Sequence, residues 1–178
     1  MDFTQQHKSD WKEIKKIYLE AFPKPERKPL FTIKHSVNKG KTKLITSTEN
    51  GILQGFAMVI PFQNAVMVDY LAVSNNIRGK GTGSKLIEKV CKQFADKKIV
   101  LLIEKINNNA PNNKQRLARK KFYIKNGFIS SDIFIDGTSG KMEILTYGGN
   151  ISVQEYLNLQ KYAMGNLMFK LSRTKTIK

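Results

Sequence analysis

The chain has 178 residues, of which 40% are hydrophobic, a length and composition that suit one globular domain with a buried core. Its 31 Lys and Arg residues against 14 Asp and Glu residues give a net charge of +17, so the protein should attract anions such as nucleic acid, acidic lipids or a phosphorylated cofactor. The single cysteine excludes an intramolecular disulfide, and no apolar run approaches the roughly 18 residues of a membrane span. We therefore expect a cytoplasmic protein with no membrane partner.

The first half of the chain predicts one helix followed by three strands. A weak strand at residues 2–6 and a capping box at Asp10 would precede a helix whose apolar residues recur between Ile14 and Ala21. The proline-rich segment 23–29 should end this helix and form an irregular connection. Turn residues then separate apolar stretches, which predicts antiparallel strands joined by hairpins at residues 42–48, 52–60 and 65–73.

The second half predicts two further helices, three strands and a C-terminal helix. The elements follow in order as a helix with an apolar stripe from Ile87 to Phe94, a buried strand at 98–106, a basic helix at 114–126, a closing hairpin at 128–135 and 141–147, and a helix at 152–170. Gly127 should end the basic helix in a left-handed conformation. Tyr156, Leu159, Leu167 and Met168 are expected as the apolar anchors of the last helix.

The segment "RGKGTG", Arg78–Gly83, lies between a predicted strand and a predicted helix. The first N–H groups of a helix have no intrahelical partner, and the helix dipole favours negative charge there. Glycines let a phosphate come close to the backbone, and Lys80 and Lys85 add positive charge. The spacing fits neither the Walker loop nor the dinucleotide fingerprint. The segment is therefore either an anion-binding loop of another kind or a flexible connection.

Two short motifs resemble those of the GCN5-related N-acetyltransferase (GNAT) superfamily. Arg78, Gly81 and Gly83 match the Arg-x-x-Gly-x-Gly of motif A, and "FYIKNGF" at residues 122–128 matches the end of motif B. The resemblance implies an α/β (α+β) fold in which helices flank a mixed, mostly antiparallel central sheet of six to seven strands. We expect a single domain over 1–178, with a core of about 1–148 and an extra C-terminal helical extension at 150–178.

The resemblance also implies an acetyl-CoA-dependent N-acetyltransferase, with acetyl-CoA as cosubstrate and no metal. In the family, a neutral amine attacks the thioester directly. Backbone amides of the glycine loop hold the pyrophosphate, and here these residues are Arg78, Gly79, Lys80, Gly81, Thr82, Gly83 and Ser84. The preceding strand pairs with the pantetheine arm, which carries over to Leu71, Ala72 and Val73.

Four residues are candidates for the chemistry or for binding the acceptor. Tyr123 matches the family's tyrosine that protonates or hydrogen-bonds the leaving thiolate. Asp69 is the only charge between Glu49 and Arg78, and it is either a base or acceptor-binding group or a salt-bridge partner. Glu104 ends an apolar strand, and it is either such a functional group or a strand-edge residue. Glu26 lies where the family often places a substrate-binding loop.

Three functions remain open at this stage. The first is acetyl transfer to a small amine or a peptide amine, and the second is a CoA-binding module without turnover. The third is a nucleic-acid binder, although no specific nucleic-acid motif is present. Arg116 replaces an Asn that is frequent in the family, and with Arg119 it falls on the stripe of Tyr123. An arginine there could approach a CoA phosphate, but we expect mainly solvated charge. A homodimer is compatible with the sequence.

Overall fold

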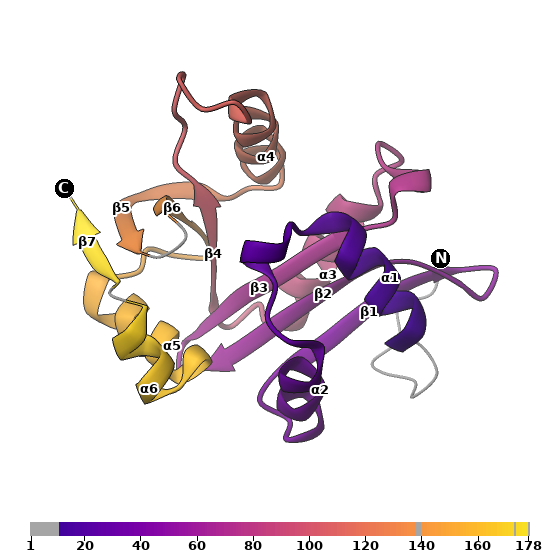
Figure 1. Cartoon of the computed structure of the whole chain (residues 1–178), viewed down its shortest axis with the longest axis horizontal. Coiled ribbons are helices and arrows are strands. Elements are labelled where there is room, and N and C mark those ends of the chain that lie inside the picture. Colours follow the sequence, from indigo (N-terminus) through magenta and orange to yellow (C-terminus); the bar gives the residue numbers. More distant parts are fainter. Residues whose placement is uncertain (1–10, 138–139, 173, 178) are drawn as a thin grey trace. The chain divides into compact units, whose positions relative to one another are not determined.

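The computed structural model describes residues 11–137, 140–172 and 174–177. The chain forms two compact units, of which unit 1 comprises the residues up to Pro61 with Val68–Gln93, and unit 2 comprises Phe62–Met67 with the residues from Phe94 onward. Strand β3 contributes to both units (Figure 1). The expected capping box at Asp10 and the strand at residues 2–6 lie outside the described residues.

Unit 1 packs helices on both faces of a strand layer. Its elements are helices α1 (Trp11–Ala21), α2 (Leu30–Asn38) and α3 (Thr82–Gln93), 3-10 turns η2 (Lys24–Glu26) and η3 (Asn75–Ile77), and strands β1 (Lys43–Glu49), β2 (Ile52–Phe62) and β3 (Ala65–Val73). β1 pairs with β2 in antiparallel register, with an irregularity between Ser47 and Thr48. Helices α1 and α2 lie on one face of these strands, and α3 lies on the other (Figure 1).

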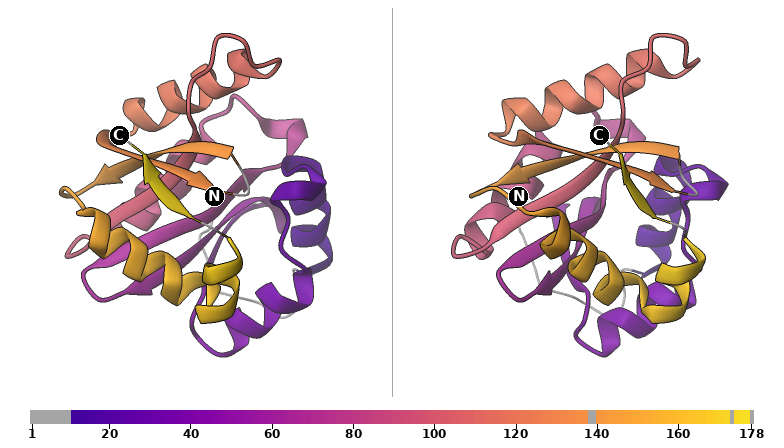
Figure 2. Two further views of the ribbon diagram at one scale, coloured as in Figure 1. Left: turned by 60° about the vertical axis from the view of Figure 1, so that its left-hand side comes forward. Right: turned by 90° about the vertical axis from the view of Figure 1, so that its left-hand side faces the viewer.

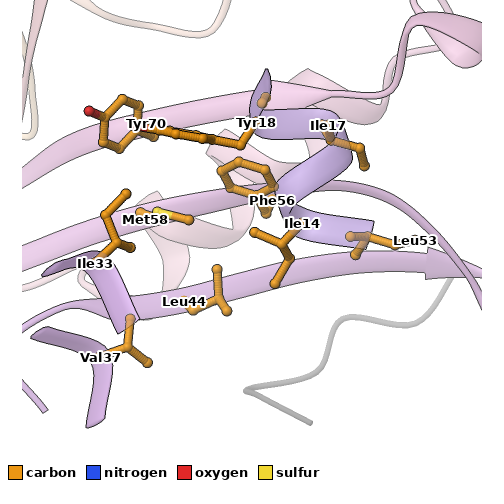
Figure 3. Close-up of a cluster of buried hydrophobic side chains, with 11 residues drawn as sticks. Ile14, Ile17, Tyr18, Ile33, Val37, Leu44, Leu53, Phe56, Met58 and Tyr70 are labelled. Carbon is orange, nitrogen blue, oxygen red and sulfur yellow. The ribbon is translucent and has the colours of Figure 1, made fainter. Parts of the chain in front are cut away.

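The core of unit 1 lies between the strands and helices α1 and α2 (Figure 3). Alternate strand residues such as Phe56 and Met58 point toward these helices, as the two-residue period of a strand requires. Gly55 faces the opposite side, where a Cβ atom would lie 2.6 Å from the carbonyl oxygen of Ala72 and 3.1 Å from a methyl carbon of Leu86. Only glycine therefore permits the close approach of β2 and β3 at this point.

Unit 2 contains a second group of strands with helices on either side (Figure 2). Its elements are the first residues of β3, strands β4 (Lys98–Glu104), β5 (Ile129–Gly137), β6 (Gly140–Tyr147) and β7 (Lys175–Ile177), and helices α4 (Asn113–Lys125), α5 (Val153–Met164) and α6 (Asn166–Leu171). β6 pairs with β4 and β5 in antiparallel register, and β7 adds antiparallel to β5. Helix α4 lies on one side of these strands and α5 on the other (Figure 2).

The strand order is β1-β2-β3-β4-β6-β5-β7. Parallel pairing joins β3 to β4, while the pairs of β1 with β2, β4 with β6, β5 with β6 and β5 with β7 are antiparallel. The predicted fold class, a mixed and mostly antiparallel sheet of six to seven strands flanked by helices, is confirmed.

Three local predictions differ from the structure. Helix α2 was not predicted; Pro29 stands at its N-cap, a position where proline costs no helical hydrogen bond. The expected last helix breaks at Gly165, whose φ of 81° ends α5 before α6 begins. Leu167 and Met168 are not core anchors, because they are 71% and 54% exposed.

Candidate functional site

The glycine loop connects β3 to α3 through two left-handed residues in unit 1. Gly79 and Gly81 have φ values of 86° and 83°, and a Cβ atom at either position would meet nothing within 4 Å. Glycine is thus favoured here by the backbone conformation and not by crowding. Helix α3 begins at Thr82, and the N–H of Lys85 donates to the carbonyl of Gly81 at 3.1 Å, which closes the first turn.

The N–H groups at the start of α3 are left without acceptors. Within the described part of the chain, no hydrogen bond is made by the backbone N–H groups of Gly79, Gly81, Thr82, Gly83 and Ser84. The hydroxyl of Thr82 is also buried without a partner there. The exposed side chains of Arg78, Lys80 and Lys85 form no ion pair with any described residue. A helix start with free donors, positive dipole and surrounding cations can hold a phosphate group.

The strand before this loop has little pairing on one edge. β3 pairs in parallel with β4 only over Ala65–Met67, which face Lys98–Val100. Among the described strands, β2 is therefore the only neighbour of the stretch from Val68 to Val73. The predicted pantetheine residues, Leu71, Ala72 and Val73, lie in this stretch. An extended ligand arm could add to such an edge through backbone hydrogen bonds.

Asp69 lies in the same stretch of β3 and forms an ion pair with Lys28. The Nζ atom of Lys28 lies 2.7 Å from each carboxylate oxygen, and the two side chains are 34% and 17% exposed. Lys41 belongs to the same neighbourhood, because burial and, second, the charge of Lys28 lower the pKa of Lys41. The structure thus places Asp69 against a primary ammonium group, supplied by the connection between α1 and α2.

Two tyrosines position the segment that carries Lys28. The Tyr18 hydroxyl accepts the N–H of Lys28 at 2.8 Å and donates to its carbonyl at 3.1 Å. The Tyr70 hydroxyl accepts the same N–H at 3.1 Å and donates to the carbonyl of Glu26 at 2.9 Å. Burial and, second, the charge of Asp69 raise the pKa of Tyr70 well above its usual range, so this phenol keeps its proton. The structure therefore brings the backbone of Glu26 close to the strand of Asp69.

Glu104 in unit 2 is surrounded by donors from α4 and the residue before it. Its Oε1 accepts from Asn112 at 2.9 Å and pairs with Arg116 at 3.1 Å, and its Oε2 pairs with Arg119 at 3.0 Å. The guanidinium of Arg116 also donates to the carbonyl of Lys105 at 2.7 Å. The expectation of mainly solvated charge on this stripe is therefore wrong for Arg116, which is 19% exposed, because the end of β4 supplies buried acceptors.

Tyr123 lies in the last turn of α4, where the motif "FYIKNGF" forms a Schellman cap. The N–H of Phe128 donates to the carbonyl of Tyr123 at 3.1 Å, and that of Gly127 donates to the carbonyl of Ile124 at 3.0 Å. Gly127 has the expected left-handed φ of 85°. The rings of Tyr123 and Phe128 pack with centroids 5.6 Å apart. Burial raises the pKa of Tyr123 to about 12, so the phenol is protonated in neutral solution.

The partners of both carboxylates were not identified from the sequence. Tyr70 directly follows Asp69 in an apolar strand, and a buried tyrosine hydroxyl usually needs a hydrogen-bond partner. The sequence therefore contained a signal that polar groups from elsewhere in the chain meet this strand. Lys28 lies far from Asp69 in the sequence, in a segment rich in exposed charges, and carried no such signal. For Glu104, the spacing of Arg116 and Arg119 did predict a common stripe, but the end of β4 could not be placed against it.

Other features limit what the described residues can do. They contain no group of three or more His, Cys, Asp or Glu side chains that could hold a metal ion. Burial raises the pKa of the Cys91 thiol to about 11, which agrees with a core thiol and not a nucleophile. Across the same residues, no helix is both long and apolar enough to cross a bilayer.

Comparison with known proteins identifies relatives of this architecture. The family model described as "Acetyltransferase (GNAT) domain" matches residues 41–130. The "Putative acetyltransferase YjbC" of Bacillus subtilis (strain 168) is 37% identical over 71 residues, which span 40% of this chain and 34% of that protein.

Solved structures agree in fold at low sequence identity. A structure titled "Putative acetyltransferase from GNAT family", from Bacteroides thetaiotaomicron, is 18% identical with a TM-score of 0.72, covering 95% of this chain and 98% of that one. A GNAT family acetyltransferase from Elizabethkingia anophelis, solved with acetyl-CoA bound, is 16% identical with a TM-score of 0.61, covering 82% and 96%. The family model matches half of the chain, and both structures share the fold: the chain belongs to the GNAT acetyltransferase family.

Proposed function

We propose that the protein transfers the acetyl group of acetyl-CoA to a primary amine by direct attack of the amine on the thioester. Membership of the family supports acetyl transfer in general. The observation that carries the proposal for this chain is the set of backbone N–H groups without acceptors among the described residues, those of Gly79 and of Gly81 to Ser84. The basic side chains of Arg78, Lys80 and Lys85 flank this set. This donor set fits the pyrophosphate of CoA.

The strand edge next to the loop fits the remainder of the cofactor. Leu71, Ala72 and Val73 lie in the part of β3 without a strand partner on one side, so their backbone groups are available to the amide-containing pantetheine arm. Solved structures of similar fold with coenzyme A or acetyl-CoA bound support the same cosubstrate for this chain. No metal is needed for this reaction.

The chemistry requires a base, a nucleophile and a proton for the leaving group. The neutral amine nitrogen bonds to the thioester carbonyl carbon, the carbon–sulfur bond breaks, and the departing thiolate takes a proton from Tyr123. The new amide nitrogen loses a proton to a carboxylate or to water, and this proton replaces the one that Tyr123 gave, so the net products are the amide and the free thiol of CoA. Since burial keeps Tyr123 protonated at neutral pH, it is suited to the role of donor.

Asp69 is the better of the two candidate carboxylates for the acceptor. It already holds one primary ammonium, that of Lys28, and an incoming amine could exchange with this flexible side chain. The backbone of Glu26 lies beside the same strand, so its side chain remains our candidate for a further acceptor contact. The three polar partners of Glu104 instead favour a structural role for that carboxylate. The acceptor is a small amine or a peptide amine.

A CoA-binding module without turnover is the second candidate. Both Asp69 and Glu104 are engaged in ion pairs, which is the observation that favours it. Both candidate functions use the glycine loop to bind CoA. They differ in whether Asp69 binds an acceptor amine and whether Tyr123 protonates the leaving thiolate. Binding and turnover must therefore be measured separately.

The loop is tested by calorimetric titration of the protein with acetyl-CoA. We expect micromolar binding by the wild type and loss of binding in a Gly81→Glu variant, whose carboxylate would occupy the anion site. The matched control is Gly51→Glu, since Gly51 has a similar φ of 74° and equally open surroundings but lies in the turn between β1 and β2. Equal binding by the Gly81→Glu and control variants would contradict the placement of the phosphates.

Turnover is tested in an amine screen that follows CoA release. With an acceptor in hand, Tyr123→Phe should lower kcat by about 10²-fold or more while leaving acetyl-CoA affinity within a few fold, because only the proton donor is removed. Binding of acetyl-CoA with no turnover toward any amine class would favour the silent module. Unchanged kcat in the Tyr123→Phe variant would remove this tyrosine from the mechanism.

A further inference from the structure

Helix α6 exposes an apolar face that the described residues leave uncovered. Leu167, Met168 and Leu171 are 71%, 54% and 61% exposed. At 3.6 residues per turn, these three side chains fall within an arc of about 100°, whereas Phe169 points away from that arc and is half-buried. We call the three residues the α6 face. Neighbouring large apolar side chains exposed together are typical of an interaction site.

The α6 face lies within a strongly positive part of the sequence. After Glu155 the chain has five basic residues and no acidic one. Lys161, Lys170 and Lys175 are exposed, and Lys170 lies on α6 itself, beside the apolar arc. Glu155, the last carboxylate, is engaged by Lys98 at 2.8 Å and by the N–H of Ser152 at 2.8 Å. A partner of this surface should therefore be apolar at its centre and negative around it.

The charge of this segment and the type of its exposed side chains restrict the class of partner that can bind the α6 face. A second copy of the chain would bring a further net charge of +17 against this basic segment, which opposes self-association. Single-stranded nucleic acid is bound on aromatic platforms, and all three residues of the α6 face are aliphatic. An anionic bilayer surface supplies both properties at once, with negative headgroups above an apolar layer.

We propose that the α6 face binds an anionic membrane surface, with Leu167, Met168 and Leu171 at the boundary between headgroups and acyl chains. Lys170, which is exposed on the same helix, contacts the anionic headgroups, and the other basic residues after Glu155 add to the attraction. The sequence-based expectation of no membrane partner depended only on the absence of a spanning segment, and a surface helix needs none. This binding is independent of the proposed acetyl transfer.

The first test is co-sedimentation of the full chain with vesicles. In about 0.1 M salt, we expect the wild type to pellet with vesicles of phosphatidylcholine containing about one third phosphatidylglycerol, and to pellet far less with phosphatidylcholine alone. The triple variant Leu167→Gln, Met168→Gln, Leu171→Gln should bind the anionic vesicles on the order of tenfold more weakly or worse. A control double variant, Phe31→Gln with Ile52→Gln, changes residues of unit 1 that are 75% and 65% exposed and should bind as the wild type.

A second variant reports insertion directly. In a Leu167→Trp variant, the added tryptophan fluorescence should shift to shorter wavelength with anionic vesicles and should be quenched by lipids brominated in their acyl chains. Equal vesicle binding by the triple variant and the wild type would overturn the proposal, because charge alone would then explain the binding. An emission that does not shift would overturn it as well. The same holds if the triple variant binds an RNA homopolymer or an acidic protein more weakly than the wild type but binds vesicles equally well.

Discussion

Two carboxylates, Asp69 in unit 1 and Glu104 in unit 2, have side chains of equal exposure, 17%, but very different partners. Asp69 is held by one lysine, which contributes a single flexible ammonium. Glu104 is held by two arginines and an asparagine, all close together on or just before α4. The difference teaches that burial alone does not mark a reactive carboxylate. A carboxylate with one exchangeable partner is suited to bind a substrate amine, and one with three fixed partners is suited to anchor a helix.

The largest expected effect is on turnover in an Asp69→Asn variant. If Asp69 binds the acceptor amine, kcat/KM for the amine should fall by about 10²-fold, while acetyl-CoA affinity should not change. The measurement is steady-state kinetics beside calorimetry, with Glu49→Gln as control because Glu49 is an exposed residue at the end of β1. An Asp69→Asn variant with wild-type kcat/KM would show that a carboxylate with one exchangeable partner does not bind the acceptor here.

The next effect is on stability in a Glu104→Gln variant. Loss of the charge would leave Arg116 and Arg119 without their counter-ion, and we expect the free energy of unfolding to fall by about 2 kcal/mol. The midpoint of denaturant unfolding measures this change, and turnover per folded molecule should stay within a few fold. Glu88→Gln is the matched control, since Glu88 forms a solvent-exposed pair with Lys92 whose loss should leave the midpoint nearly unchanged. Lost turnover at an unchanged midpoint would instead make Glu104 the functional carboxylate.

The smallest expected effect on stability is at Glu155, an exposed carboxylate with which the two half-buried ones can be compared. Hydrogen bonds from Lys98 and, second, from Ser152 hold the pKa of Glu155 at about 2. Its stabilisation is therefore complete above its ordinary pKa and is lost as the pH falls toward about 2. Glu155→Gln should cost roughly 1 kcal/mol at neutral pH, mostly through the capping box with Ser152, because the side chain is 45% exposed.

The check is thermal unfolding of the wild type and the Glu155→Gln variant over a pH series. The difference between their Tm values should shrink as the pH falls through the range from about 4 to about 2. Glu20→Gln, on the exposed side of α1, serves as the control. A difference that stays constant across this range would show that Glu155 does not act through its charge.

Local sequence patterns predicted most of the helices and strands, but they did not predict which strands far apart in the chain pair with one another. The strand at 65–73 was predicted to the residue, because its apolar run is bounded by a tight turn and the glycine loop. Helix α2 was not predicted, although Ile33 and Val37 lie four residues apart on its buried side. The prolines that precede it favour an irregular connection in this segment. Strand β7 pairs with β5, a partner about 40 residues earlier in the chain, and no pattern in three residues predicts such a partner.

The local conformations of the glycine loop and of the segment around Tyr123 were predictable for the same reason, since each is a short motif whose conformation is set by its own residues. Left-handed glycines and a Schellman cap are local, so the sequence is enough to identify them. The environment of Asp69 was not predictable, because it depends on Lys28, which reaches it only after α1 has packed on the strands and Tyr18 and Tyr70 have fixed the connection.

Gly55 provides a way to disturb the strand proposed to bind acetyl-CoA without changing any residue proposed to contact it. Even an alanine there would place a methyl group against the carbonyl of Ala72, so β2 and β3 would have to separate at the stretch Leu71–Val73. In a search for temperature-sensitive alleles, position 55 should thus give proteins that fold when cold yet release their cosubstrate on warming. Spontaneous revertants of such alleles should restore glycine at position 55, because a smaller residue at Leu86 would relieve only the 3.1 Å contact and not the 2.6 Å contact with the backbone of Ala72.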